Sequence, residues 1–171
     1  MEAIINKVAN SGLISIDMEE WLPKGPFKEI DLKSILWQGL ILREQDLKDF
    51  LSAIDYAQFE GSYLNVLCSE EVILPQWIYA LISAKFSPFC NKITWGNQTD
   101  LFNELLSDQI DTIDVSRYTD QRIVVKGCSN VEIAPRIYMK LIAKLQPVAK
   151  SLMYGEPCST VPLYKKKTNT K

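Results

Sequence analysis

Three Cys-Ser dipeptides are the residues of this chain that could carry thiol or hydroxyl chemistry: Cys68-Ser69, Cys128-Ser129 and Cys158-Ser159. A cysteine thiolate is both a nucleophile and a metal ligand. Thiolates at neighbouring strand ends could approach one ion, because adjacent strands lie about 4.8 Å apart. The sequence therefore predicts a thiolate-bound metal or iron–sulfur cluster on Cys68, Cys128 and Cys158. The predicted binding site also takes in Ser69, Ser129, Ser159, Thr160 and Glu156.

A second interpretation of these residues is structural. Buried cysteine packs as a small apolar residue, and serine is common in turns and helix caps. The chain contains no CxxC motif, and the cysteines are spaced by 60 and 30 residues, which matches no standard zinc or iron–sulfur motif. The fourth cysteine, Cys90, lies outside the pattern and is expected to be a packing residue. The chain also lacks histidine, which excludes Cys/His zinc sites and Ser-His-Asp triads.

Two further classes of function stay open beside a metal-binding accessory protein. In a small-molecule enzyme, Cys128 or Ser129 would be the nucleophile and Glu132 or Lys126 the base. In a structural interaction module, such as a homodimer, all the thiols would be buried. The sequence alone does not choose among the three classes.

An internal repeat places two of the dipeptides in the same setting. The segment Arg122–Pro135 repeats Tyr63–Pro75: each has an apolar run, Cys-Ser, polar residues, an apolar pair and a proline. The similarity extends over residues 55–98 and 114–157. The second copy carries one extra residue near Gly127, where a glycine at a strand end would permit a bulge or tight turn.

Each copy has the pattern of a strand, a helix and a second strand. In the first copy the strands are Tyr63–Leu67 and Lys92–Trp95, and the helix is Pro75–Lys85, with proline near its first turn. Such crossovers make parallel strands. The predicted fold is α/β, a largely parallel sheet built from two duplicated βαβ units with flanking helices. Ligands of such sheets bind at the carboxyl ends of the strands, where Cys68 and Cys128 lie.

Other segments give weaker patterns. Leu13–Asp17 alternates like a strand, and Asp31 is a candidate N-cap of a short helix through Trp37. An amphipathic helix is predicted over Asp46–Ile54, and another from a Thr99 cap through Leu106.

Length and composition indicate one globular protein. A chain of 171 residues predicts a single domain over residues 1–171. The net charge of −2 and pI near 5.3 argue against nucleic-acid binding, which requires a basic face. No apolar run approaches the roughly 18 residues of a membrane span, and the start lacks a signal peptide, so a cytoplasmic protein with reduced thiols and no membrane association is expected.

Three motifs resemble, as a set, a bacterial family of unknown function, the domain-of-unknown-function family 2480, found mainly in Bacteroidetes. They are Gln38–Glu44, Lys126–Asn130 and Met153–Lys165, and the resemblance covers nearly the whole chain. It transfers no catalytic residue. It implies a cytoplasmic, non-catalytic accessory role in sulfur, metal or iron–sulfur metabolism, with iron–sulfur assembly proteins as partners.

Overall fold

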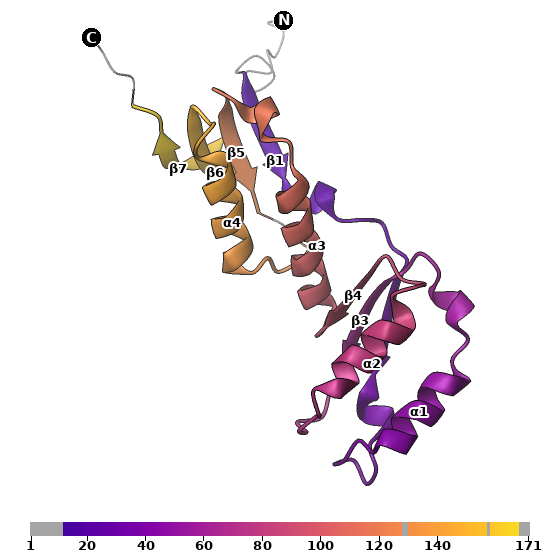
Figure 1. Ribbon diagram of the computed structural model, residues 1–171. Coiled ribbons are helices and arrows are strands. Elements are labelled where there is room, and N and C mark those ends of the chain that lie inside the picture. Colours follow the sequence, from indigo (N-terminus) through magenta and orange to yellow (C-terminus); the bar gives the residue numbers. More distant parts are fainter. Residues whose placement is uncertain (1–11, 128–129, 157, 168–171) are drawn as a thin grey trace, which may run out of the picture. The chain divides into compact units, whose positions relative to one another are not determined.

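The computed structural model describes residues 12–127, 130–156 and 158–167, which fold as two compact units (Figure 1). Unit 2 comprises Lys24–Glu104, and unit 1 comprises the segments before and after it. The division falls within α3 (Gln98–Thr112), so the first half of this helix belongs to unit 2 and the second half to unit 1.

Unit 2 is a three-stranded sheet of order β2-β3-β4 in which every pairing is parallel. Two α-helices pack on one of its faces, and 3-10 helices follow β2 and precede β3 (Figure 1). In chain order the elements are β2 (Phe27–Asp31), η2 (Leu32–Ile35), α1 (Glu44–Ala53), η3 (Tyr56–Phe59), β3 (Tyr63–Leu67), α2 (Trp77–Phe86) and β4 (Lys92–Trp95).

The central strand β3 is buried on both faces. Leu64 and Val66 point into the apolar core beneath α1 and α2. Asn65 points to the opposite face and is 2% exposed, so its amide needs hydrogen-bond partners. It donates to the Glu29 carboxylate at 2.8 Å and to the Gly96 carbonyl at 3.4 Å. These bonds tie together the middles of β2 and β3 and the end of β4.

Unit 1 is a four-stranded sheet of order β1-β5-β6-β7. The first three strands are parallel, and β7 is antiparallel to β6. Helices α3 and α4 contribute to the core on one face of this sheet (Figure 1). The elements besides α3 are β1 (Leu13–Asp17), η1 (Met18–Trp21), η4 (Val115–Tyr118), β5 (Arg122–Lys126), α4 (Pro135–Leu145), β6 (Ser151–Glu156) and β7 (Ser159–Lys165).

The central strand of unit 1, β5, is also buried on both of its faces. Three consecutive residues, Ile123, Val124 and Val125, are at most 1% exposed. Consecutive strand residues point to opposite faces, so both faces of the sheet are covered at β5. The core of unit 1 shares no residue with the core of unit 2.

An aspartate caps each of the four 3-10 helices in the part of the chain that the structure describes, and its carboxylate accepts a hydrogen bond from the backbone N–H two residues later. The bonds are 2.9–3.1 Å long and join Asp17 to Glu19, Asp31 to Lys33, Asp55 to Ala57 and Asp114 to Ser116. Such caps satisfy N–H groups that the first helical turn leaves without partners. The predicted cap at Asp31 is therefore confirmed, but its helix ends at Ile35 rather than Trp37.

The α/β class is confirmed, and three predicted strands, Leu13–Asp17, Tyr63–Leu67 and Lys92–Trp95, have the predicted bounds. The expectation of a single sheet is wrong. The N-terminal strands β1 and β2 pair with β5 and β3, respectively, so each strand–helix–strand segment joins a different sheet. Strands β2 and β7 were not predicted, and α3 extends six residues beyond Leu106.

Among the helices of the described residues, none combines the length and the apolar character that crossing a membrane requires. The prediction of a single domain over residues 1–171 stays a prediction.

Two matched core substitutions would test whether the units unfold together. Leu64→Ala in unit 2 and Ile123→Ala in unit 1 each truncate a fully buried side chain, which should cost about 2–5 kcal/mol. Because the cores are separate, we expect Leu64→Ala to accelerate amide hydrogen exchange mainly in β2–β4, and Ile123→Ala mainly in β1, β5 and β6. Equal acceleration in both units, measured by mass spectrometry, would instead show one cooperative domain.

Candidate functional site

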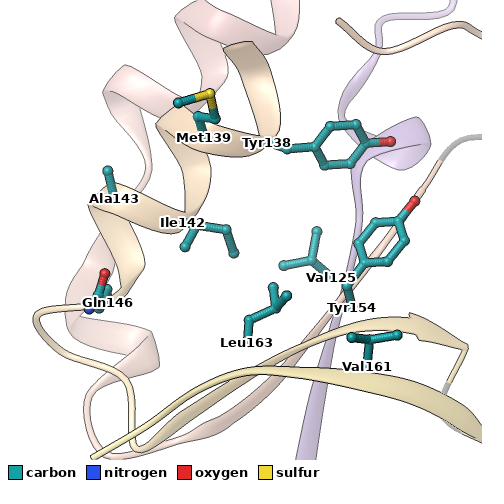
Figure 2. A pocket seen from close by; sticks show the side chains of 9 residues that line it. All are labelled: Val125, Tyr138, Met139, Ile142, Ala143, Gln146, Tyr154, Val161 and Leu163. Carbon is teal, nitrogen blue, oxygen red and sulfur yellow. The ribbon is translucent and has the colours of Figure 1, made fainter. Parts of the chain in front are cut away.

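An open apolar groove in unit 1 is the main candidate site. It lies between α4 and strands β5, β6 and β7, and has a volume of about 640 Å³ (Figure 2). Ligand pockets in proteins commonly measure about 300–1,000 Å³ and are lined mostly by apolar side chains. The lining residues are Val125, Tyr138, Met139, Ile142, Ala143, Gln146, Tyr154, Val161 and Leu163.

Helix α4 forms one wall because its sequence separates three faces. Proline occupies the first turn, where its missing N–H costs no hydrogen bond. Ile137, Leu141 and Leu145 recur at helical spacing and are buried in the core. Lys140 lies away from them and pairs with Asp111 at 2.6 Å. The flank between these two faces carries Met139, Ile142, Ala143 and Gln146, which line the groove (Figure 2).

The β6–β7 hairpin forms the opposite wall. Gly155 has a φ of 120°, and a Cβ there would lie 2.6 Å from the Ser159 carbonyl oxygen, so only glycine permits this close strand approach. Beyond it, β7 presents Val161 and Leu163, which are 60% and 47% exposed. Met139 on the helix side is 72% exposed. Large apolar side chains thus remain in contact with water on both walls of the groove.

Two tyrosines stand at the end of the groove near the carboxyl ends of β5 and β6. The rings of Tyr138 and Tyr154 meet edge to face, with centroids 5.6 Å apart. Both hydroxyl oxygens approach Gly127: a Cβ there would lie 2.8 Å from the Tyr154 oxygen and 3.4 Å from the Tyr138 oxygen. Gly127 is not among the glycines with positive φ. The extra glycine is therefore needed for close packing against Tyr154, rather than for a turn.

Charged side chains surround the same sheet edge. Lys126 pairs with Glu156 at 3.2 Å. The hydrogen bond and the charge of Glu156 raise the pKa of Lys126 above its ordinary value, against the effect of burial, and Asp17 and Glu20 add to the rise. Three carboxylates therefore act on one ammonium group, and the carboxyl edge of this sheet is acidic.

Cys68 and Ser69 lie in unit 2, directly after β3, as predicted for the carboxyl end of a parallel strand. The Ser69 amide donates to the Asp31 carboxylate at 3.0 Å. Burial would raise the pKa of Asp31, but hydrogen bonds from Ser69 and from the Lys33 amide, with the Lys33 charge, bring the pKa below its ordinary value. The Ser69 amide thus stabilises the start of the segment that follows β3, and the roles predicted for the Cys68 and Ser69 side chains stay predictions.

The third dipeptide lies at the β6–β7 turn of unit 1. Cys158 is exposed there, Ser159 begins β7, and Thr160 donates to the Met153 sulfur at 3.7 Å. Glu156 pairs with Lys126. Cys128 and Ser129 lie outside the described residues. The enzyme alternative that uses them therefore stays a prediction. Its candidate base, Lys126, forms an ion pair with Glu156.

No group of three potential metal ligands among His, Cys, Asp and Glu occurs within residues 12–127, 130–156 and 158–167. Cys68 belongs to unit 2 and Cys158 to unit 1. Since Cys128 is not described, metal binding by Cys68, Cys128 and Cys158 stays a prediction. Cys90 is half-buried and its sulfur lies 3.6 Å from the Ser62 hydroxyl, which fits its expected packing role.

The groove was not predicted from the sequence, because the search followed chemically reactive residue types. Two patterns could have indicated it. Met139 interrupts the polar side of an otherwise amphipathic helix, and Val161 and Leu163 recur at strand spacing after the last cysteine. An apolar flank on a helix and an apolar row on a neighbouring strand are the two walls of such a groove.

The fold and the site define an α/β protein of two units, one of which carries an apolar groove beside a mostly parallel sheet. The chain belongs to the family described as "Protein of unknown function (DUF2480)", whose model matches residues 2–166. The resemblance noted in the sequence is thereby confirmed. No curated protein and no solved structure matches the chain.

The packing at Gly127 gives a testable double-mutant cycle. Gly127→Ala places a methyl group 2.8 Å from the Tyr154 hydroxyl oxygen, so one of the two must move. We expect a loss of about 1–3 kcal/mol in the free energy of unfolding, as for other overpacked sites. Tyr154→Phe removes the colliding oxygen, so the same glycine substitution should cost clearly less in that background. Equal costs in both backgrounds, measured by urea denaturation, would contradict the packing role.

Thiol reactivity should differ between the two cysteines with contrasting burial. Burial raises the pKa of Cys90, and a hydrogen bond with Ser62 only partly opposes this. A raised pKa lowers the thiolate fraction at neutral pH, and Cys158 is exposed. We expect Cys158 to react with Ellman's reagent at least about tenfold faster than Cys90. The variants Cys158→Ser and Cys90→Ser would assign the phases, and loss of the slow phase in Cys158→Ser would contradict the expectation.

Proposed function

We propose that this protein is a non-catalytic binding protein, and that the groove of unit 1 holds an elongated apolar molecule with a small neutral or cationic head. The observation that carries the proposal is the groove itself: about 640 Å³, formed by nine residues whose polar groups are confined to two phenols and one amide. Specific ligand sites are built in this way, from an apolar surface with a few polar groups that fix orientation.

The driving force for binding is the apolar surface that remains exposed on both walls. Met139, Val161 and Leu163 are 72%, 60% and 47% exposed. Covering apolar surface yields about 25 cal/mol per Å² removed from water. A hydrocarbon chain lying between α4 and β7 would cover all three side chains at once. Neither wall needs to move to admit it, because the groove is already open.

The orientation of the ligand follows from the two ends of the groove. Gln146 lies at one end and the tyrosine pair at the other (Figure 2). The tyrosine end adjoins the acidic edge formed by Asp17, Glu20 and Glu156 around Lys126. A carboxylate or phosphate head would be repelled there, whereas an alcohol can hydrogen bond to the phenols and an ammonium group is attracted.

Two finer predictions from the sequence are kept as separate proposals. The proposal of a sulfur or iron–sulfur role rests on the sequence; its described thiols are the exposed Cys158 in unit 1 and the half-buried Cys68 at the end of β3 in unit 2. Iron and sulfide analysis of protein purified without oxygen would test it, and colourless, metal-free protein whose three thiols resist alkylation in the native state would end it.

We also infer that the chain contains a duplicated strand–helix–strand segment, over residues 55–98 and 114–157. The inference is supported by two parallel pairs, β3 with β4 and β5 with β6, each joined by a helix. A helix tyrosine meets an aromatic residue of the second strand edge to face in both segments, Tyr79 with Trp95 and Tyr138 with Tyr154. A positive-φ glycine follows each of these strand aromatics.

Ligand binding can be measured with the neutral fluorophore phenylnaphthylamine, whose emission rises in apolar sites. Val161→Glu places a charge on one wall at a position exposed enough to be compatible with folding. We expect it to weaken binding at least about tenfold, or about 1.4 kcal/mol, because the bound probe would desolvate the carboxylate. Leu40→Glu is the matched control, since Leu40 is 68% exposed in unit 2, and should leave binding unchanged. Unchanged binding in Val161→Glu would remove the groove as the site.

The charge of the head can be tested by displacing the probe with decanol, decylamine and decanoate below their micelle concentrations. We expect the alcohol and the amine to displace it at lower concentration than the carboxylate. Glu156→Gln removes one of the carboxylates near Lys126, so it should improve decanoate and weaken decylamine. Preferential binding of decanoate to the unmodified protein would refute the assigned head group while leaving the groove as an apolar site.

A further inference from the structure

Strand β4 of unit 2 is an unpaired sheet edge whose single charged residue, Lys92, stands at its start. Within the described residues it pairs with β3 alone, whereas β6 of unit 1 also pairs with β7. Proteins commonly place charged residues or proline in exposed edge strands, which prevents these strands from pairing with another chain. Edge strand β7 contains Pro162, and edge strand β2 contains Lys28 and Glu29. The last three residues of β4, Ile93–Trp95, are neither charged nor proline.

The direction of the free backbone groups follows from one hydrogen bond. The Gly96 amide donates to the Val66 carbonyl at 2.8 Å, so residue 96 faces β3. Backbone groups alternate in direction along a strand, so Thr94 also faces β3, and the N–H and C=O groups of Ile93 and Trp95 face the open edge. The edge therefore offers two donors and two acceptors in a regular row.

Thr94 supplies an independent observation. Its hydroxyl oxygen is the one buried side-chain nitrogen or oxygen atom within the described residues that has no hydrogen-bond partner. Buried polar atoms are nearly always satisfied, and each exception calls for an explanation. A partner outside this chain would provide one.

Helix α2, which lies beside this edge, has few polar residues on its exposed side, Ser83 and Lys85. Its ten residues, WIYALISAKF, include a single charged residue, Lys85. Its counterpart α4 carries Arg136, Lys140 and Lys144. A helix with so few polar residues is normally buried over most of its surface. Trp77 of α2 and Trp95 of β4 are nevertheless 39% and 42% exposed.

We propose that β4 pairs with β4 of a second copy of this chain, antiparallel, about a two-fold axis at Thr94. In this register Ile93 faces Trp95 of the second copy, and the two residues exchange both backbone hydrogen bonds; symmetry makes four bonds in all. The two Thr94 residues form the non-hydrogen-bonded pair between them, with Cα atoms about 4.5 Å apart. Cross-strand threonine pairs hydrogen bond to each other, so each unsatisfied hydroxyl gains its partner.

The same two-fold axis brings the apolar surfaces together. Two parallel sheets join into one sheet of order β2-β3-β4-β4-β3-β2, with the two α2 helices on the same face. Ile93 and Trp95 point to that face, where Ile93 packs on the core and the Trp95 ring meets Tyr79. A hollow of about 190 Å³ beside them, lined by Tyr79, Ser83 and Trp95 among others, is placed to receive the second copy's Trp95 ring. The surface is thus self-complementary in hydrogen bonds and in apolar contact.

The mass of the full chain in solution tests the proposal with a matched pair of variants. Trp95→Pro removes an outward N–H without removing a bond to β3, and Trp95→Ala removes the same ring while keeping the N–H. We expect the unmodified chain to be a dimer by light scattering, Trp95→Pro to be a monomer with unchanged circular dichroism, and Trp95→Ala to keep dimerising at higher concentration. A monomeric unmodified chain at high micromolar concentration would overturn the proposal, as would a Trp95→Pro dimer as stable as that of Trp95→Ala.

Cross-linking tests the register and does not depend on a proline. In a background with the four native cysteines changed to serine, Thr94→Cys should form an interchain disulfide rapidly on mild oxidation, because disulfides span Cα separations of about 4.4–6.8 Å. Lys92→Cys is the control: the two Lys92 positions lie two residues from the axis on opposite sides, beyond disulfide reach. If Thr94→Cys cross-links no faster than Lys92→Cys, the axis at Thr94 is wrong.

Discussion

Each unit depends on a central strand that is buried on both of its faces. Three consecutive residues are buried in β3 and in β5, which requires cover above and below the sheet as well as a neighbouring strand on each side. β1 and β6 flank β5, and β2 and β4 flank β3. The two N-terminal strands are therefore not accessory elements. Without them each central strand would have an unpaired edge inside its own core.

The units differ beside the strand that follows each central strand: β6 of unit 1 has a further strand next to it, whereas β4 of unit 2 does not within the described residues. Both candidate surfaces, the groove of unit 1 and the β4 edge of unit 2, follow from this difference. In unit 1 the hairpin returns as β7 and pairs with β6, and an apolar groove lies between β7 and α4. In unit 2 the chain leaves β4 directly into α3, and β4 keeps a free edge within the described residues. The helices differ in charge: α4 carries three basic residues, two of which bond to α3, whereas α2 carries a single charged residue, Lys85.

The sequence patterns predicted those features of the fold that depend on interactions between residues close together in the chain. Leu13–Asp17 was found from its alternating pattern, and Tyr63–Leu67 and Lys92–Trp95 from short apolar runs between turn residues. The helix predicted from Pro75 begins two residues later, at Trp77. The number of sheets could not be predicted. Strand pairing is decided by contacts between distant segments. Strand β2 has two adjacent charged residues, Lys28 and Glu29, and too little apolar content to be recognised as a strand.

The candidate site could likewise be predicted only in part from the sequence, because apolar binding surfaces contain no reactive residue types. A parallel sheet was expected to concentrate function at its carboxyl edge, and the tyrosine pair, Gly127 and the Lys126–Glu156 ion pair do meet there. The search of the sequence favoured cysteine and serine at that edge because reactive groups are recognised by type. Apolar side chains are recognised as a site only by shape, since the same residues fill cores elsewhere. Met139 and Val161 are apolar residues of the kind that fills protein cores, yet both are exposed. Only the folded structure distinguishes an apolar residue of the core from one on the surface.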